Sequence, residues 1–259
     1  MALFSTHYHR NYVWIPVFTA FIWLSTLLAM LITWFATGKP HYVGMVGSIP
    51  YISNIGADIL KPLFVVGCSI TGVGFFLCLV IERWLRHSGR LVPAMRKREH
   101  VFAAIAILGS FIGGGGLICL AVFDTRRYTS LHRVFLLVFI LGVGISAIFT
   151  VSEYRWLSKD YEDCQKLRYA YIAKAIIATT LIVLAIVFAI TIYTAVDVGA
   201  VFEWVISIGY SFYLLTFWYD LRLSKGVNEG DLTLRGVSTR RGEKGEANDN
   251  VQPSNFAAV

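Results

Sequence analysis

Six long apolar runs constrain the fold of this chain more than any other feature of its sequence. Each run has about 18–23 residues, which is the length that a tilted helix needs to cross a bilayer core of about 30 Å. Only 15% of the 259 residues are charged, whereas soluble domains carry about 25%. The sequence therefore predicts an all-α, polytopic membrane protein, folded as a bundle of six transmembrane helices. The predicted spans are Val13–Phe35, Leu63–Ile81, Val101–Val122, Val134–Val151, Ala175–Tyr193 and Ala200–Tyr219.

Lys and Arg are unevenly distributed between the segments that join these runs. The two terminal segments and the second and fourth connections hold 18 of the 23 Lys and Arg residues, and the fifth connection holds none. Cytosolic segments of membrane proteins are enriched in these residues, so both termini are predicted to lie in the cytosol. The predicted organisation is a cytosolic N-terminus over residues 1–12, a membrane domain over 13–223, and a disordered cytosolic tail over 224–259, which is rich in polar residues.

The second connection is the most basic part of the chain. An anionic leaflet attracts each nearby Lys or Arg by about 1 kcal/mol, so this connection is predicted to contact phosphatidylserine or phosphoinositides. Fixing the topology would account for the same charges without lipid recognition. The residues concerned are Arg83, Arg86, Arg90, Arg96, Lys97 and Arg98.

Within the runs, the small residues predict how the helices pack, and the few charged residues bear on whether the protein conducts ions. Gly109 and Gly113 form a GxxxG pattern, which predicts close packing between helices of the same chain rather than dimerisation. Glu203 is the one ionisable residue that lies well inside a run, and Lys174 is predicted to mark a cytosolic edge. Channels normally place ionisable groups deep in their spans, so ion conduction is not expected. The sequence leaves a scramblase-like groove as an alternative.

The four cysteines form no CxxC pair, and Cys164 lies in a loop. We therefore expect neither a disulfide framework, a metal site nor a cofactor, and the apolar composition predicts no nucleic-acid partner.

Polar residues from distant parts of the sequence are predicted to meet at the outer face. Glu203 lies three residues into its run, about 5 Å of helix rise from the boundary. The loop after Val122 and the long first outer loop bring further acids and bases to the same side. Such a cluster would offer cations to a phosphate and acceptors to an amine, as a phospholipid headgroup requires. Alternatively, these side chains reach for water or pair with each other. The set is Asp58, Asp124, Arg126, Arg127, His132 and Glu203.

Three motifs in order along the spans resemble the Frag/DRAM/Sfk family of six-span membrane proteins, and its fungal Sfk-like branch in particular. They are "PYISNIGA" (Pro50–Ala57), "FDTRRYTSLH" (Phe123–His132) and "EWVISIGYSFYLLTF" (Glu203–Phe217). The segments "ERWLRHSGRL" and "ISAIFTVSEY" also look like that branch. Asn54 departs from the pattern, which has aspartate there.

This resemblance implies a protein of lipid homeostasis in the plasma membrane, or alternatively in the ER, Golgi or vacuole/lysosome. It implies a role in phosphoinositide levels, phosphatidylinositol 4-kinase recruitment and transbilayer lipid asymmetry, with phospholipids and a kinase complex as partners. Relatives in autophagy and in GPI-anchor remodelling also belong to the family. To the outer cluster it adds Tyr51, Ser53 and Trp204.

An enzyme that remodels GPI-anchor lipid is the alternative function. Asp124, His132 and Glu203 would then form an acid–base set, with His132 as the general base. The chain has no GxSxG nucleophile motif, so the sequence favours a non-enzymatic regulator and leaves catalysis open.

Overall fold

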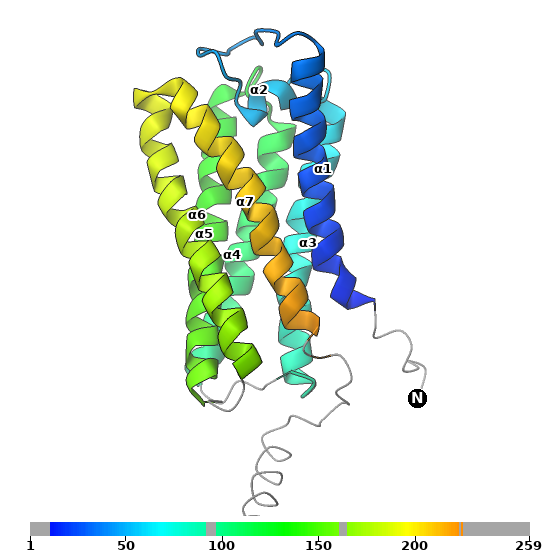
Figure 1. The fold of residues 1–259 in the computed structure, drawn as a ribbon, viewed down its shortest axis with the longest axis vertical. Helices are drawn as coiled ribbons and strands as arrows, with labels where there is room; N and C mark the ends of the chain where they lie inside the picture. The colour runs from blue at the N-terminus through cyan, green and yellow to red at the C-terminus, as the bar shows by residue number, and fades with distance from the viewer. Residues whose placement is uncertain (1–10, 92–96, 161–164, 223, 225–259) are drawn as a thin grey trace, which may run out of the picture.

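The computed structural model describes residues 11–91, 97–160, 165–222 and 224, and every regular element in that part of the chain is a helix. Six of its helices are long and apolar enough to cross a membrane, which confirms the predicted six-span bundle. Figure 1 shows them side by side, with a short helix across one end. The elements are a 3-10 turn, η2 (Tyr12–Trp14), and the α-helices α1 (Ile15–Ala36), α2 (Ile52–Gly56), α3 (Lys61–His87), α4 (Lys97–Val122), α5 (Thr129–Asp160), α6 (Gln165–Thr194) and α7 (Val196–Arg222).

The long helices close into a ring. Helix α1 packs between α3 and α7, and the ring continues from α3 through α4, α5 and α6 back to α7. Its interior is filled by aromatic side chains, among which Phe75 of α3 lies against three rings of α7 at centroid distances of 5.8–6.3 Å. Those three rings are Tyr210, Tyr213 and Phe217.

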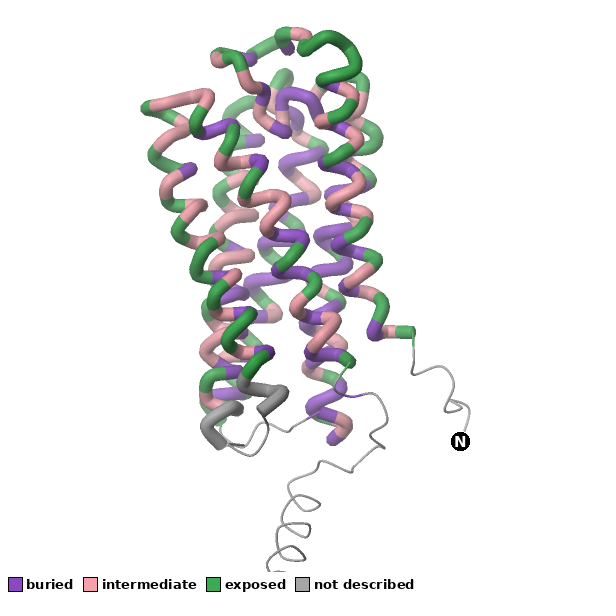
Figure 2. Tube along the Cα trace, viewed as in Figure 1, coloured by how far each residue is buried: buried purple, intermediate pink, exposed green. Residues whose placement is uncertain are grey.

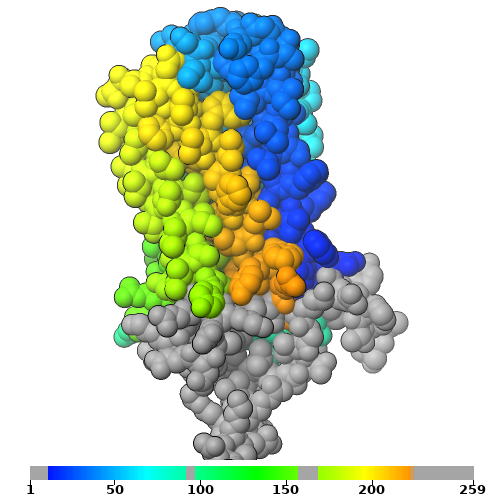
Figure 3. All heavy atoms as spheres, in the orientation of Figure 1, coloured from blue at the N-terminus to red at the C-terminus, as the bar shows by residue number. Residues whose placement is uncertain are grey.

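The two ends of the bundle differ. We call the end that carries α2 the cap end, and the end at which η2 begins and α7 finishes the terminal end (Figure 1). Residues 37–60 cover the helix ends at the cap end (Figure 3). At the terminal end, the Tyr12 and Ser224 hydroxyls are 2.8 Å apart, so both ends of the membrane domain lie on the same side. Which membrane face that side meets stays a prediction from the Lys and Arg distribution.

Glycines let α4 approach its neighbours closely. A Cβ atom added to Gly109 would lie 2.9 Å from the Gly142 carbonyl oxygen of α5, and one added to Gly113 would lie 2.8 Å from the Val143 nitrogen. On the opposite side, a Cβ on Gly114 would lie 2.7 Å from the Gly72 oxygen of α3. No side chain fits at these distances, so the GxxxG pattern serves packing within the chain, as predicted.

Helix α6 is the least enclosed member of the ring. Only 11% of its most apolar window is buried, against 50% for α3 and for α4. Figure 2 shows this contrast between α6 and the purple interior of the bundle. The closely packed side of the bundle is therefore α3–α4–α5, and α6 covers the remaining side loosely.

Gly142→Ala tests the glycine contact, because its Cβ would meet the Gly113 nitrogen, whereas Gly144, two residues on, has open space around it. We expect Gly142→Ala to lower the free energy of unfolding by about 1–3 kcal/mol through overpacking. Gly144→Ala should be neutral or stabilise by up to about 1 kcal/mol, because alanine favours helix. Thermal unfolding of the purified variants measures both. Equal melting temperatures for the two would contradict the role of the glycine.

Candidate functional site

At the cap end, two adjacent residues of α7 hold the start of α2. The Glu203 carboxylate accepts a hydrogen bond from the Ile52 N–H at 2.6 Å, and the Trp204 indole N–H donates to the Pro50 carbonyl at 3.0 Å. A buried backbone N–H needs an acceptor, and the Glu203 side chain supplies one to Ile52. The carboxylate inside an apolar run thus has a partner from the first loop, which it fixes to the bundle.

The first turn of α7 holds the preceding residues of the same loop. One Asp197 oxygen accepts from the N–H groups of Ser48 and Ile49, at 2.6 and 2.9 Å. This approach requires glycine at position 47, because a Cβ there would collide with that Asp197 oxygen. The Tyr51 hydroxyl donates to the Val196 carbonyl at 3.0 Å.

The Tyr51 phenol lies near two acidic side chains of α7. Burial raises the pKa of its phenol above the usual value, and the charges of Glu203 and Asp197 raise it further. Tyr51 therefore stays protonated and remains a hydrogen-bond donor. Its backbone N–H donates to the Asn54 side-chain oxygen at 3.0 Å. Asn54 thus acts as an acceptor at the position where the resemblance predicts aspartate.

A second cap-end group joins α3, α4 and α5. Asp124, in the loop after α4, forms an ion pair with Lys61 at the start of α3. Its other oxygen accepts from the Arg127 N–H at 2.7 Å. Burial alone would raise the pKa of Asp124, but the Lys61 hydrogen bond and the Arg127 N–H together lower it below the usual range. The carboxylate is therefore ionised at neutral pH and fixes the shape of this loop.

His132 also joins helices. Its side chain is buried, and Nδ1 lies 2.8 Å from the Leu120 carbonyl oxygen and 3.1 Å from that of Phe123. Carbonyl oxygens only accept hydrogen bonds, so Nδ1 must carry the proton. His132 therefore ties the first turn of α5 to the last turn of α4.

Few of the predicted site residues remain accessible at the cap end. Arg126 and Asp58 form an exposed pair at 4.0 Å, with side chains that are 52% and 49% exposed. The Arg127 side chain is exposed as well, and Ser53 is half-buried. The structure thus sorts the predicted cluster into anchors of the fold, namely Tyr51, Asp124, His132, Glu203 and Trp204, and accessible groups, namely Asp58, Arg126 and Arg127.

The terminal end contains a buried polar network that the sequence did not reveal. The Glu82 carboxylate accepts from Arg86 at 2.8 Å and from the Tyr154 hydroxyl at 2.7 Å. Lys174 forms an ion pair with Asp220, and its ammonium lies 4.6 Å from the centre of the Tyr154 ring. The network links α3, α5, α6 and α7.

The burial of this network was not predicted. Lys174 was predicted at a cytosolic edge, and it lies five residues from the start of its candidate span, where it is fully buried. Glu82 and Asp220 lie five and two residues from the ends of their candidate spans, and both are buried as well. The only sequence sign was the spacing of Glu82 and Arg86, four residues apart on one helix face. Nothing in the sequence could pair Lys174 with Asp220, 46 residues away.

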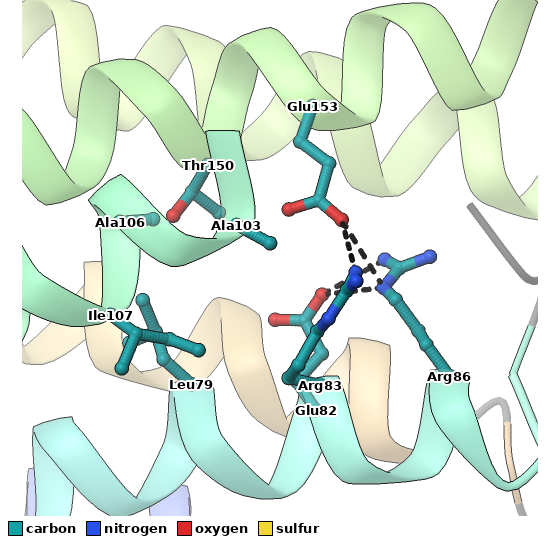
Figure 4. Close-up of a pocket in the computed structure, with 9 residues that line it drawn as sticks. All are labelled: Leu79, Glu82, Arg83, Arg86, Ala103, Ala106, Ile107, Thr150 and Glu153. Carbon is teal, nitrogen blue, oxygen red and sulfur yellow. Dashed lines mark hydrogen bonds and ion pairs between the residues drawn. The ribbon is translucent and has the colours of Figure 1, made fainter. Parts of the chain in front are cut away.

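A small polar cavity adjoins this network. It has a volume of about 10 Å³, which suits one water molecule. In Figure 4, Glu153 faces Arg83 and Arg86 across it. The Glu153 oxygen is 3.9 Å from an Arg83 nitrogen and 3.8 Å from an Arg86 nitrogen. These separations exceed a direct hydrogen bond, so Glu153 interacts with both arginines by charge alone.

The basic residues of the second connection therefore differ in accessibility. Arg86 is buried and paired with Glu82, which removes it from the surface that meets a leaflet. Arg83 is turned toward Glu153, and Arg90 is half-buried, whereas Lys97 and Arg98 are exposed. The predictions for Arg96 and Cys164, and nearly all of the predicted N-terminal segment and disordered tail, lie outside the described residues. In the described part, no three His, Cys, Asp or Glu side chains gather as metal ligands would.

Lys174→Met is expected to lower the free energy of unfolding by about 3–5 kcal/mol, because it leaves the Asp220 carboxylate buried and uncompensated. The double variant Lys174→Met/Asp220→Leu should be more stable than Lys174→Met alone, since it removes both charges. Thermal unfolding measures the three proteins. If Lys174→Met unfolds within about 1 kcal/mol of the unmodified protein, the pair does not stabilise the bundle.

Asp124 makes a pH-dependent contribution to stability. Because folding lowers its pKa, that contribution is complete above the ordinary carboxyl pKa and is lost as the pH falls through the lower value of the folded state. Asp124→Asn should destabilise the protein at pH 7 and weaken the loss of stability between about pH 5 and 3. Melting temperatures across that range test this. Parallel curves for Asp124→Asn and the unmodified protein would refute it.

The part of the chain that matches known proteins includes the polar residues of both the cap end and the terminal end. Residues 11–224 match the family described as Frag1/DRAM/Sfk1/Cwh43P N-terminal domain. Protein sfk1 of Schizosaccharomyces pombe is 28% identical over 210 residues, which make up 81% of this chain and 63% of that protein. Protein SFK1 of Saccharomyces cerevisiae is 30% identical over 189 residues, or 61% of this chain and 53% of that protein. The chain thus spans less than two thirds of either relative's length. No solved structure matches it.

Proposed function

Because the chain belongs to the Frag1/DRAM/Sfk1 family, we propose that it is a non-enzymatic integral membrane regulator of lipid homeostasis. In this proposal it acts on phosphoinositide signalling through a phosphatidylinositol 4-kinase and on the transbilayer organisation of phospholipids, at the plasma membrane. The cap end faces the outer leaflet and binds a phospholipid headgroup there. The terminal end faces the cytosol.

The fixed position of Arg126 and Arg127 supports the headgroup site. The nearest acid in sequence, Asp124, is occupied by Lys61 and by a backbone N–H, so it does not neutralise these two side chains. The backbone of the loop is held while both guanidinium groups stay exposed. A pair of adjacent guanidinium groups on a rigid loop suits a phosphate, since each offers a planar fork of donors.

Asp58 gives the proposed site a second chemistry. It lies 4.0 Å from Arg126, and both side chains are about half exposed, so this ion pair is weak. A headgroup with both a phosphate and an amine can replace it, with the phosphate on the arginines and the amine on Asp58. Phosphatidylserine and phosphatidylethanolamine have that pattern.

The cytosolic half of the proposal depends on Lys97 and Arg98. Both are exposed at the terminal end, where an anionic leaflet would attract them. The alternative, an enzyme that remodels GPI-anchor lipid, receives less support. His132 is only 4% exposed, so a substrate has little access to its Nε2, and Asp124 is paired with Lys61.

The double variant Arg126→Gln/Arg127→Gln tests the headgroup site. After reconstitution with equal phosphatidylserine and phosphatidylcholine, the unmodified protein should retain phosphatidylserine preferentially. The variant should lose about tenfold in that preference, because the two guanidinium groups can also bind the serine carboxylate, which phosphatidylcholine lacks, and charge-assisted hydrogen bonds contribute about 1.5–3 kcal/mol each. Native mass spectrometry of the extracted protein measures the retained lipid.

Lys39→Gln/Arg133→Gln is the matched control, since it removes two other exposed cations from the same end. It should keep the phosphatidylserine preference. If both double variants keep it, or both lose it equally, Arg126 and Arg127 do not form the site.

A further inference from the structure

Aromatic side chains that carry a polar group mark both ends of the exposed surface of the bundle. Among the described residues, five Trp or Tyr side chains are exposed, by 48–77%, and each lies near the end of a helix. We call those at the terminal end the terminal belt, namely Trp14, Trp84 and Tyr169, and those at the cap end the cap belt, namely Tyr128 and Tyr193. Trp and Tyr are enriched where hydrocarbon meets lipid headgroups, so the belts mark the two boundaries of the bilayer.

The surface between the two belts is apolar and uncharged. Phe111 of α4 and Val183 of α6 lie well inside their helices, yet they are 62% and 54% exposed. The exposed Asp, Glu, Lys and Arg side chains of the described part lie in loops or in the terminal turns of helices. Soluble proteins rarely expose a continuous apolar surface of this extent. Lipid chains therefore cover the sides of the bundle, and the belts set the thickness of the lipid layer that fits.

Helix α6 reaches both belts and gives the distance between them. Tyr169 and Tyr193 are 24 residues apart, which corresponds to about 36 Å of helix rise. The one charged residue between them, Lys174, is buried. Tyrosine rings of such belts sit at the level of the headgroups, so this distance is an upper bound on the thickness of the hydrocarbon layer.

Two other helices give similar lengths. On α5, the exposed Arg133 and Arg155 are 22 residues apart, about 33 Å. On α4, the exposed Val101 and Val122 are 21 residues apart, about 32 Å, with no charged residue between them. An average helix tilt of about 20° shortens such lengths by about 6%. The hydrocarbon layer that fits the bundle is therefore about 30–34 Å thick.

The helices cannot adjust to a thinner layer one at a time. A single helix shortens its span by tilting, but neighbouring helices of this bundle are joined at both ends. Lys61 of α3 pairs at the cap end with Asp124, which follows α4, and Lys174 of α6 pairs at the terminal end with Asp220 of α7. A mismatch must therefore be accommodated by the whole bundle or by the bilayer.

We propose that this protein is matched to a thick bilayer, with a hydrocarbon core of about 32 Å, and that a core of about 27 Å leaves it mismatched. The plasma membrane, rich in sterol and sphingolipid, has about the first thickness, and the endoplasmic reticulum has about the second. Such differences in thickness sort proteins between membranes. The match belongs to the sides of the bundle, so it holds whatever headgroup the cap end binds, and it favours the plasma membrane by thickness alone.

Thermal unfolding in bilayers of different thickness tests the match. The protein is reconstituted in nanodiscs of phosphatidylcholine whose two chains are myristoleoyl, oleoyl, eicosenoyl or erucoyl, in order of increasing length. The shared headgroup separates this test from that of the headgroup site. The melting temperature should be highest with eicosenoyl or erucoyl chains and about 3–6 °C lower with oleoyl chains. A maximum with myristoleoyl or oleoyl chains, or equal melting temperatures in all four lipids, would overturn the proposal.

Two variants of α6 test whether the cap belt is the boundary. Ile190 is 59% exposed and lies three residues inside Tyr193, so Ile190→Asp moves the edge of the apolar surface inward by about 4.5 Å. Its highest melting temperature should shift to oleoyl chains. Thr194→Asp is the matched control, because it places the same charge on the same face just beyond Tyr193, and it should keep the preference for longer chains.

An unchanged preference in Ile190→Asp, or the same shift in both variants, would place the boundary elsewhere and refute the match. If Ile190→Asp does not fold, the four melting temperatures of the unmodified protein decide the question on their own.

Discussion

Hydrocarbon cannot satisfy polar groups, so this chain must satisfy its own wherever they are buried, and that constraint shapes both ends of the bundle. At the cap end, carboxylates of α7 accept from backbone N–H groups of the first loop, as Glu203 does from Ile52. At the terminal end, side chains pair with each other, as Lys174 does with Asp220. Each such pair joins segments that are distant in sequence, and together they fix the ring of helices.

Between the two polar layers, packing density differs from one side of the bundle to the other. Glycines bring the α4 backbone against α3 and α5, as Gly114 does with Gly72, and leave no space there. Glycine has the opposite effect at Gly144, where no neighbouring helix fills the space. Glycine therefore allows close packing at one helix interface and leaves unfilled space at another. The difference lies in whether a second backbone approaches.

The polar residues of the cap end serve mainly to hold the fold. Five of the predicted site residues bind backbone groups or a partner side chain. What remains accessible is small, namely Arg126, Arg127 and Asp58. A rigid loop that presents a few accessible charges suits recognition of a headgroup better than chemistry on it, because His132 and Asp124, the groups able to move protons, are buried.

The sequence alone determined the six spans, the common side of both chain ends and the close packing at Gly109 and Gly113, because the length of apolar runs and the spacing of small residues are local properties. It also predicted that Tyr51, Asp124, His132, Glu203 and Trp204 lie at one end of the bundle, where the structure places them, but not that they hold the fold. Only the tertiary structure decided that Glu203 anchors a loop and that Lys174 is buried beside Asp220. In helices that are apolar on every side, the sequence pattern does not show which face meets which neighbour, so the partners of buried charges become visible only when the ring is assembled.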